Sequence, residues 1–389
     1  MNDILLNIIA VMLPISVLQF ISLPYIGKVL GSETYGEIVF IISVFTFISF
    51  PIGNVLNNVR LLNNEQYEKR EITGDFNLLV LYSIIIGIIM FVAYSTQNNF
   101  LNKIDILLIL LIIILTITKE YFIVSFRLVL NFKGIVLNNI YLAVGYLIGT
   151  YIFVWTNYWE FIYIIGLILS NIYIYKNTSL VREGLGRTRL FRNTLKDSLY
   201  LYSAGIVKNL VTHADKLLLY PLLGPQNVAI YYSSSIIGKM ISMFVNPANT
   251  VILSYLVKSS KKVKMLSYLF ISVFLGSVFY LLILLIGPLF LEIFYSAWSK
   301  ESVLLLKYTA AASIVSVIAN LFRPFNMRFN DLKWQLYING SYLIIYITLT
   351  IMLTKQYGII GFAIGVLIAA TYNLVIQITV YYLNTKTFG

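Results

Sequence analysis

The sequence predicts an all-α integral membrane protein with about twelve transmembrane helices, and three observations predict it. Of the 389 residues, 59% are hydrophobic and only 11% are charged, whereas about a quarter of the residues in soluble domains are charged. The mean hydropathy is +0.85. Apolar stretches of roughly 20 residues, the length that spans a bilayer, recur along the whole chain.

The first of these stretches lacks a basic segment before it and runs too long for a secretory signal, so we expect it to be the first membrane helix. The expected spans, in chain order, are 4–27, 37–60, 75–96, 104–130, 138–155, 159–176, 198–221, 226–256, 265–288, 301–322, 334–354 and 358–383.

The net charge of +12 would suggest nucleic acid as a partner of a soluble protein. Here the positive-inside rule accounts for it. With both termini in the cytoplasm of a bacterium, the loops and helix ends on that side hold 19 lysines and arginines, and the outer side holds four. We therefore expect a multi-pass protein of the inner (cytoplasmic) membrane, with the lipid bilayer and not nucleic acid as its surroundings.

Several kinds of chemistry are excluded by residue type. The chain has no Cys, which excludes disulfides and thiolate sites, and its one histidine, His213, argues against a His-based metal site. No glycine-rich nucleotide loop and no nucleophile–His pairing is present. We expect no enzyme activity, no cofactor and no metal, with any energy coupling through a proton or sodium gradient.

A basic, polar loop from Lys176 to Lys196 divides the chain near its middle. It predicts an N-terminal six-helix lobe at 1–180, a cytoplasmic linker at 181–197 and a C-terminal six-helix lobe at 198–389. The two halves resemble each other weakly, which is typical of transporters with parallel repeats. The matching positions are Leu30-Gly31 with Leu223-Gly224, and Tyr158, Gly166 and Tyr173 with Tyr357, Gly365 and Tyr372.

Polar residues form a stripe along two of the predicted helices. On 226–256 the stripe has alternating spacings of three and four; on 37–60 it is less regular. Packing between helices and the lining of a water-filled cavity both fit such a stripe, and the central lysine favours the cavity. Pro51 and Pro247 lie in these helices, where we expect them to bend. The stripe residues are Tyr232, Ser235, Lys239, Ser242 and Asn246 on the later helix, and Thr46, Asn57 and Arg60 on the earlier one.

The helix predicted at 198–221 carries Lys208, Thr212 and Asp215 within about 60° of one another. Charged residues at membrane depth usually mark functional sites. An internal ion pair is the alternative, but Asp215 and Lys208 are two turns apart and would need other partners. Lys208 and Lys239 both lie near mid-depth, so together they can present two cations to one anionic ligand such as a phosphate.

A second charged pair, Lys119 and Glu120, lies past the middle of the helix predicted at 104–130. It either forms salt bridges with other helices or faces the cavity. Asp215 and Glu120 are the carboxylates that we expect to couple transport to an ion gradient or to partner the lysines. Arg60 and Arg127 also fit interfacial anchors.

Three motifs resemble polysaccharide flippases of the multidrug/oligosaccharidyl-lipid/polysaccharide (MOP) exporter superfamily, of the Wzx type. Leu23-Pro-Tyr-Ile-Gly-Lys-Val-Leu-Gly-Ser-Glu-Thr-Tyr-Gly-Glu-Ile is similar to the signature of helices 1 and 2. The run Ala214-Asp-Lys-Leu-Leu-Leu-Tyr-Pro-Leu-Leu-Gly-Pro-Gln-Asn-Val-Ala-Ile-Tyr resembles that of helices 7 and 8, and Lys355-Gln-Tyr-Gly-Ile-Ile-Gly-Phe-Ala-Ile-Gly the turn between helices 11 and 12.

The resemblance implies a V-shaped, two-lobed transporter with a central cationic cavity. It implies alternating access that moves undecaprenyl-pyrophosphate-linked oligosaccharide repeat units outward, beside a polysaccharide polymerase and a chain-length regulator. Related lipid II flippases carry arginines on helices 1, 2 and 8, where this chain has only Lys28, Arg60 and Lys239. It also lacks their two extra helices, which favours an O-antigen or capsule unit.

Two other functions fit part of the sequence. A drug exporter of the same superfamily needs a mostly acidic or neutral cavity for cationic drugs, whereas these spans contain more lysine than carboxylate. An O-antigen polymerase commonly has a large outer loop, and all the outer loops expected here are short.

Overall fold

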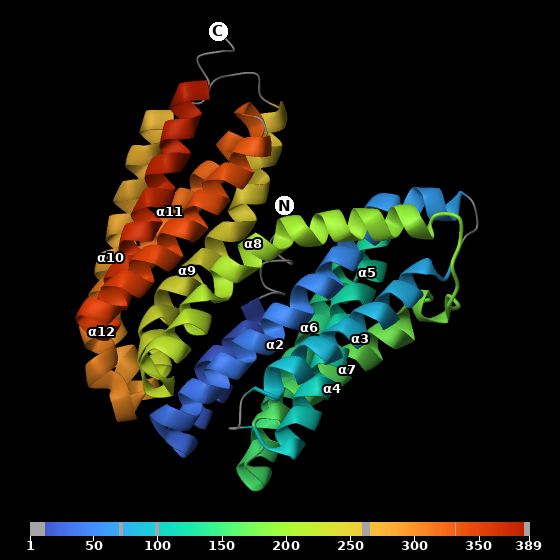
Figure 1. Cartoon of the computed structure of the whole chain (residues 1–389), viewed down its shortest axis with the longest axis horizontal. Helices are drawn as coiled ribbons and strands as arrows, with labels where there is room; N and C mark the ends of the chain where they lie inside the picture. Colours follow the sequence, from blue (N-terminus) through green and yellow to red (C-terminus); the bar gives the residue numbers. More distant parts are fainter. Residues whose placement is uncertain (1–11, 70–72, 98–100, 259–264, 331, 385–389) are drawn as a thin grey trace. The chain divides into compact units, whose positions relative to one another are not determined.

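The computed structural model describes residues 12–69, 73–97, 101–258, 265–330 and 332–384. Within these ranges only the backbone is described at 204, 207, 208, 243–258, 265–267, 327, 328, 332, 333, 336 and 384. All secondary structure in the described part is helical (Figure 1), which confirms the predicted all-α class.

Ten long helices form most of the described chain. They are α2 (Leu23–Glu68), α3 (Asp75–Ser95), α4 (Lys103–Phe122), α6 (Phe132–Thr156), α7 (Glu160–Asn177), α8 (Phe191–Leu223), α9 (Pro225–Lys258), α10 (Met265–Phe294), α11 (Ser299–Phe329) and α12 (Leu332–Asn384). The short elements are the π-helix η1 (Leu18–Ser22), α5 (Val124–Leu128) and the 3-10 turns η2 (Leu180–Arg182) and η3 (Ser296–Trp298).

The bilayer explains why the chain is helical, because backbone groups in lipid must find their hydrogen bonds within the protein. Seven helices of the described part are long and apolar enough to cross a membrane. Two of them, Met12–Glu68 with 57 residues and Tyr337–Leu383 with 47, are far longer than a bilayer requires. Met12–Glu68 covers the predicted span 37–60 and the described part of the span 4–27, whose residues 4–11 lie outside the described residues. Tyr337–Leu383 covers most of the spans 334–354 and 358–383, and the other predicted spans lie on separate long helices.

Glycines break the two longest helices where the sequence predicts turns. Gly31 interrupts α2 with φ 81°, and Gly358 interrupts α12 with φ 58°. This left-handed backbone is open to glycine because it has no Cβ. By contrast α2 continues with helical backbone through Pro51.

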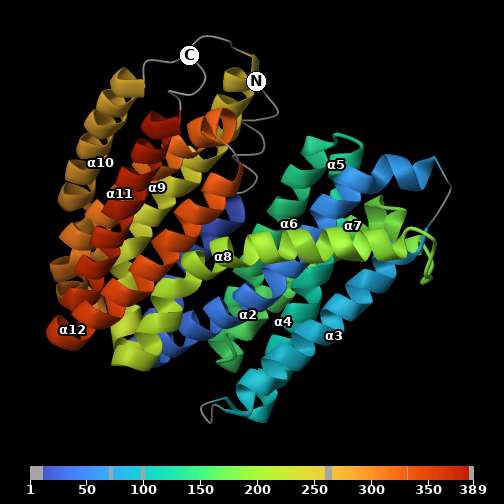
Figure 2. The ribbon, with the colours of Figure 1, turned by 45° about the horizontal axis from the view of Figure 1, so that its top comes forward.

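By packing, the described chain forms two compact units. Unit 1 comprises Met1–Leu23 and Ile41–His213, and unit 2 comprises Pro24–Phe40 and Ala214–Gly389, so far as they are described. In unit 1, α7 packs on α4 and α6, and α3 packs on α4. In unit 2, α11 packs on α9, α10 and α12 (Figures 1 and 2).

These units differ from the predicted lobes at two helices. The start of α2 belongs to unit 2, where a Cβ on Gly36 would lie 1.8 Å from the Pro225 carbonyl oxygen. The start of α8 belongs to unit 1, where the Thr194 and Tyr67 hydroxyls are 2.7 Å apart. The six-plus-six division into lobes stays a prediction.

Glycines bring α6 and α7 into backbone contact in unit 1. A Cβ on Gly145 would lie 2.5 Å from the Gly166 Cα, and one on Gly149 would lie 2.5 Å from the Ile162 Cα. Small residues four apart commonly allow such close approach of membrane helices. The contact leaves no room for a larger side chain.

Replacing Gly145 with Val should destabilise unit 1 by about 1–3 kcal/mol, the usual effect of overpacking. The helical Gly205 has open space around its Cα, so Gly205→Ala is the control and should be neutral or stabilising by up to about 1 kcal/mol. Thermal unfolding of the purified protein in detergent measures both. Equal melting temperatures for the two variants would show that the α6–α7 contact is not tight.

Candidate functional site

Three charged residues of unit 2 form what we call the Asp215 cluster: Asp215 and Lys216 on α8, and Lys239 on α9. Asp215 Oδ1 accepts a hydrogen bond of 2.9 Å from the Lys216 backbone N–H and lies 3.3 Å from Lys216 Nζ. The other carboxylate oxygen, Oδ2, accepts a hydrogen bond from Lys239 Nζ. One buried acid therefore binds two lysines.

The three side chains differ in exposure. Asp215 and Lys216 are 7% and 11% exposed, whereas Lys239 is 37% exposed. A buried carboxylate without a partner costs several kcal/mol, so the lysines stabilise Asp215 in its charged form. Two lysines against one acid leave one excess positive charge, and Lys239 is the lysine that a ligand can reach.

Tyrosine rings surround the cluster. Lys216 Nζ lies 5.7 Å from the centroid of the Tyr232 ring, and Lys239 Nζ lies 6.0 Å from that of Tyr231. Such cation–π contacts favour an ammonium group near an aromatic face. Tyr342 and Tyr346 of α12 pack in one hydrophobic cluster with Ala214, the residue before Asp215.

The stripe predicted on α8 and α9 is only partly described. Ser235 is buried and donates its hydroxyl to the Tyr232 carbonyl, as a packing residue does. Ser242 is half-buried on α9, and Thr212 is exposed on α8. The side chains of Lys208 and Asn246 lie outside the described part, so their predicted cavity roles are not tested.

In unit 1, Arg60 on α2 forms a two-pronged ion pair with Glu183 of the linker. Its Nη1 donates to Glu183 Oε2 at 3.1 Å and its Nη2 to Oε1 at 2.7 Å. The Arg60 side chain is 5% exposed and its guanidinium lies 4.9 Å from the Phe76 ring centroid. Burial raises the pKa of the Glu183 carboxyl above its usual range, and Arg60 opposes that rise.

Further hydrogen bonds fasten the linker to unit 1. Asp75 accepts bonds from the Thr188 backbone N–H at 2.7 Å and from the Tyr67 hydroxyl at 2.8 Å. Asn77 donates to the Leu180 carbonyl at 3.1 Å. The whole linker therefore belongs to unit 1, and Arg60 helps to hold it in place through Glu183.

The polar stripe on α2 connects to α4 and α5. Asn57 is buried and donates to the Glu120 carbonyl at 2.8 Å, while Arg127 donates to the side-chain oxygens of Asn57 and Asn58. The Glu120 carboxylate pairs with Lys119 at 2.7 Å, with both side chains nearly buried. Lys119 and Glu120 thus pair with each other within α4, whereas one predicted alternative was salt bridges to other helices. The other alternative, that the pair faces the cavity, stays a prediction.

Thr46 is half-buried on α2. The structure thus brings Asn57, Glu120 and Lys119 together in unit 1, and Asp215 and Lys239 together in unit 2.

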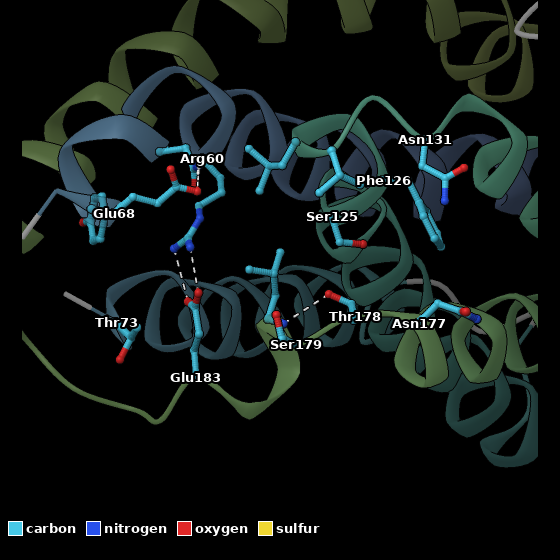
Figure 3. Close-up of a pocket in the computed structure, with 15 residues that line it drawn as sticks. Arg60, Glu68, Thr73, Ser125, Phe126, Asn131, Asn177, Thr178, Ser179 and Glu183 are labelled. Carbon is cyan, nitrogen blue, oxygen red and sulfur yellow. Dashed lines mark hydrogen bonds and ion pairs between the residues drawn. The ribbon is translucent and has the colours of Figure 1, made fainter. Parts of the chain in front are cut away.

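A pocket of about 510 Å³ adjoins Arg60, and we call it the Arg60 pocket. Figure 3 shows Arg60 and Glu183 pointing toward each other from opposite sides of it. Parts of α2, the α5–α6 turn, the end of α7 and the linker line it. The lining residues are Arg60, Asn64, Tyr67, Glu68, Thr73, Ser125, Phe126, Leu128, Val129, Asn131, Asn177, Thr178, Ser179, Leu180 and Glu183.

Sequence reasoning missed two members of these clusters. Lys216 was not among the predicted site residues, although a lysine next to Asp215 within an apolar span was a usable signal. Glu183 lies in a polar loop with no periodic pattern, so nothing in the sequence joined it to Arg60. No group of three or more metal-ligating side chains occurs among the described residues.

Comparisons with known proteins agree with the all-helical membrane fold. Residues 4–260 match the model of a family described as polysaccharide biosynthesis protein. None of the curated proteins compared with the chain matches its sequence.

Solved structures share the fold over nearly the whole chain. The lipid II flippase MurJ in an inward closed conformation has a TM-score of 0.75 and 16% identity over 98% of this chain and 90% of its own. An inward-facing multidrug resistance MATE family transporter of the MOP superfamily has a TM-score of 0.70 and 13% identity over 98% of this chain and 97% of its own. A third structure is a MOP superfamily transporter from Pyrococcus furiosus, reported with reversed polarity of its binding pocket. Its TM-score is 0.62, with 15% identity over 99% of this chain and 95% of its own. These likenesses show the MOP-superfamily fold of a multi-pass membrane protein.

Replacing Arg60 with Met should destabilise the protein by about 3–5 kcal/mol, because Glu183 then remains buried without a partner. Arg60→Met together with Glu183→Met should be less harmful than Arg60→Met alone. Thermal unfolding in detergent measures both variants.

The matched control is the exposed pair of Lys69 and Glu65, whose side chains are 71% and 76% exposed. Lys69→Met should change stability by less than about 1 kcal/mol. A double variant no more stable than Arg60→Met would contradict the pairing.

Proposed function

We propose, since this chain belongs to the polysaccharide biosynthesis protein family, that it is a flippase for undecaprenyl-pyrophosphate-linked oligosaccharide repeat units. It moves them across the bacterial cytoplasmic membrane for the assembly of O-antigen or capsular polysaccharide. The observation that carries this proposal is the half-exposed Lys239, an ammonium group on a predicted membrane helix beside a buried acid.

Lys239 is suited to bind a diphosphate because it can leave Asp215 at little cost. Asp215 keeps the Lys216 ammonium and the Lys216 backbone N–H as partners after Lys239 has moved. The departure therefore does not leave a buried charge unpaired, the situation that is strongly destabilising. The substrate's diphosphate would take the place of the carboxylate as the partner of Lys239.

The excess charge of the Asp215 cluster favours an anionic substrate. A cationic drug would meet the excess positive charge of Lys216 and Lys239, so the drug-exporter alternative gains no support from this site. The MOP-superfamily fold is common to multidrug transporters and a lipid II flippase. The fold therefore does not distinguish a drug exporter from a flippase, and the charge of the site and the family are the observations that favour the flippase.

The proposed mechanism is alternating access between the lobes at 1–180 and 198–389. Lys208 shares the binding of the diphosphate with Lys239, and Lys119 and Arg60 are further candidates for contact with substrate. Asp215 or Glu120 couples transport to a proton or sodium gradient, and α2 and α9 bend at Pro51 and Pro247 as access alternates. Both termini lie in the cytoplasm, and a polymerase and a chain-length regulator act on the flipped unit.

Replacing both Lys208 and Lys239 with Ala should abolish surface glycan assembly while the amount of protein in the membrane stays normal. The cations that hold the diphosphate are then missing. Glycan is measured by gel electrophoresis of surface polysaccharide from cells whose only copy of the gene is the variant. Undiminished glycan would refute the assignment of these lysines.

A second prediction follows from the proposal that Asp215 releases Lys239 and keeps Lys216. Lys239→Gln should weaken the binding of inorganic pyrophosphate about tenfold to a hundredfold, since a hydrogen bond to a charged group contributes roughly 1.5–3 kcal/mol. Lys216→Gln should also weaken it, because Asp215 then has Lys239 as its one ammonium partner and retains it. Titration calorimetry of the protein in nanodiscs measures both.

The control for this argument is Asp215→Asn combined with Lys216→Gln. With the carboxylate gone, Lys239 is no longer held and binding should return to the wild-type level or above. Binding as weak as in Lys216→Gln alone would show that Lys216 acts on pyrophosphate directly and not through Asp215.

A further inference from the structure

The Arg60 pocket has the size and the lining of a binding site, and neither the family nor the proposed diphosphate site accounts for it. Its volume of about 510 Å³ lies within the range of roughly 300–1,000 Å³ typical of small-molecule sites. All its lining residues belong to unit 1. We propose that it binds a neutral, hydroxyl-rich sugar residue.

The charge of the lining argues against a phosphate. Arg60 is the one basic residue among the lining residues, and both of its Nη groups are bound to Glu183. Glu68 adds a second acid to the lining, so acids outnumber bases. An anion would be repelled here, in contrast to the Asp215 cluster.

The polar side chains offer both donors and acceptors, as hydroxyl groups require. Asn131 uses its side-chain oxygen to cap α6 at the Gly134 N–H, at 2.9 Å, which leaves its NH₂ group as a donor. Asn177 uses its NH₂ group on the Tyr173 carbonyl at 2.8 Å, which leaves its oxygen as an acceptor. Figure 3 shows these two asparagines at the same end of the pocket.

Glu183 supplies a fixed acceptor. Each of its oxygens accepts one hydrogen bond from Arg60 and retains a further lone pair. The ion pair thus locks the carboxylate in one orientation, so that binding a pair of hydroxyls costs little side-chain entropy. Phe126, Leu128 and Leu180 form apolar parts of the wall, against which the C–H faces of a sugar ring can pack.

The position of the pocket suits the first binding of a substrate sugar from the cytoplasm. This step rests on the proposed function. The elements that line it carry the loops expected to face the cytoplasm, where lipid-linked units are made. The shared chemistry is a sugar residue, which can come from a lipid-linked oligosaccharide or from a nucleotide-activated sugar. Under the proposed function we expect the lipid-linked source.

Saturation-transfer NMR on the full protein in nanodiscs tests the proposal. The probes are glucose, galactose, rhamnose and N-acetylglucosamine, each at millimolar concentration, with UDP-N-acetylglucosamine as a separate probe. At least one of the four sugars should show saturation transfer to its ring protons. With UDP-N-acetylglucosamine, signals confined to the sugar support the lipid-linked source, and equal signals from the uridine would overturn it.

Two Trp variants of the same turn provide the matched pair. Ser179 lines the pocket and is exposed, so Ser179→Trp places a bulky ring in an accessible part of the wall. Val181 is 39% exposed and does not line the pocket, so Val181→Trp is the control. The sugar signal should fall at least fivefold in the first variant and less than twofold in the second.

Two results would overturn the pocket assignment: no signal from any of the four sugars, or equal signals from the wild type and Ser179→Trp. Either result can occur while pyrophosphate binding at Lys239 remains intact, because the two sites lie in different units. Conversely, loss of the diphosphate site leaves the sugar signal in place. The failure of this inference and that of the proposed function are therefore distinguishable.

Discussion

A carboxylate buried away from water must be neutralised, and the way in which this chain neutralises Asp215 determines what its second unit can do. Two lysines bind the same acid, one nearly buried and one more exposed. A single lysine would have to remain with Asp215, since its departure would leave an isolated charge in a low-dielectric interior. With Lys216 in place, Lys239 is free to exchange the carboxylate for another anion. Under the proposed function, this arrangement lets Lys239 bind and release a charged ligand while Asp215 keeps Lys216 as its partner.

Unit 1 meets the same requirement in a different way. Arg60 and Glu183 satisfy each other through two hydrogen bonds and leave no spare charge. This pair holds the linker on unit 1 and forms one wall of the Arg60 pocket, whose remaining polar groups are neutral amides and hydroxyls beside Glu68. Under the proposed function, a cationic site and a polar site without excess positive charge are the two chemistries that a diphosphate joined to sugars would need. We therefore assign the diphosphate and the sugar to separate units.

The sequence predicts the helices well because span length and hydropathy are local properties that the bilayer enforces. It also marks Lys239 and Asp215, because charges in apolar helices stand out. It does not identify their partners, since helical periodicity relates residues of one helix only and the Asp215–Lys239 bond joins two. Glu183 was missed for the same reason: its partner Arg60 is 123 positions away. The packing of the start of α2 with unit 2 likewise depends on tertiary contacts at Gly36, which hydropathy does not encode.

The most direct test of the central claim is a flipping assay in proteoliposomes with a fluorescent, NBD-labelled undecaprenyl-pyrophosphate-linked disaccharide. Dithionite quenches the label in the outer leaflet, so the slow phase of quenching reports transfer between leaflets. The account predicts that wild-type protein speeds this phase well above that of protein-free liposomes, and that Lys239→Gln slows it at least tenfold. Equal rates for the wild type and Lys239→Gln, or a wild-type rate no faster than that of empty liposomes, would contradict it.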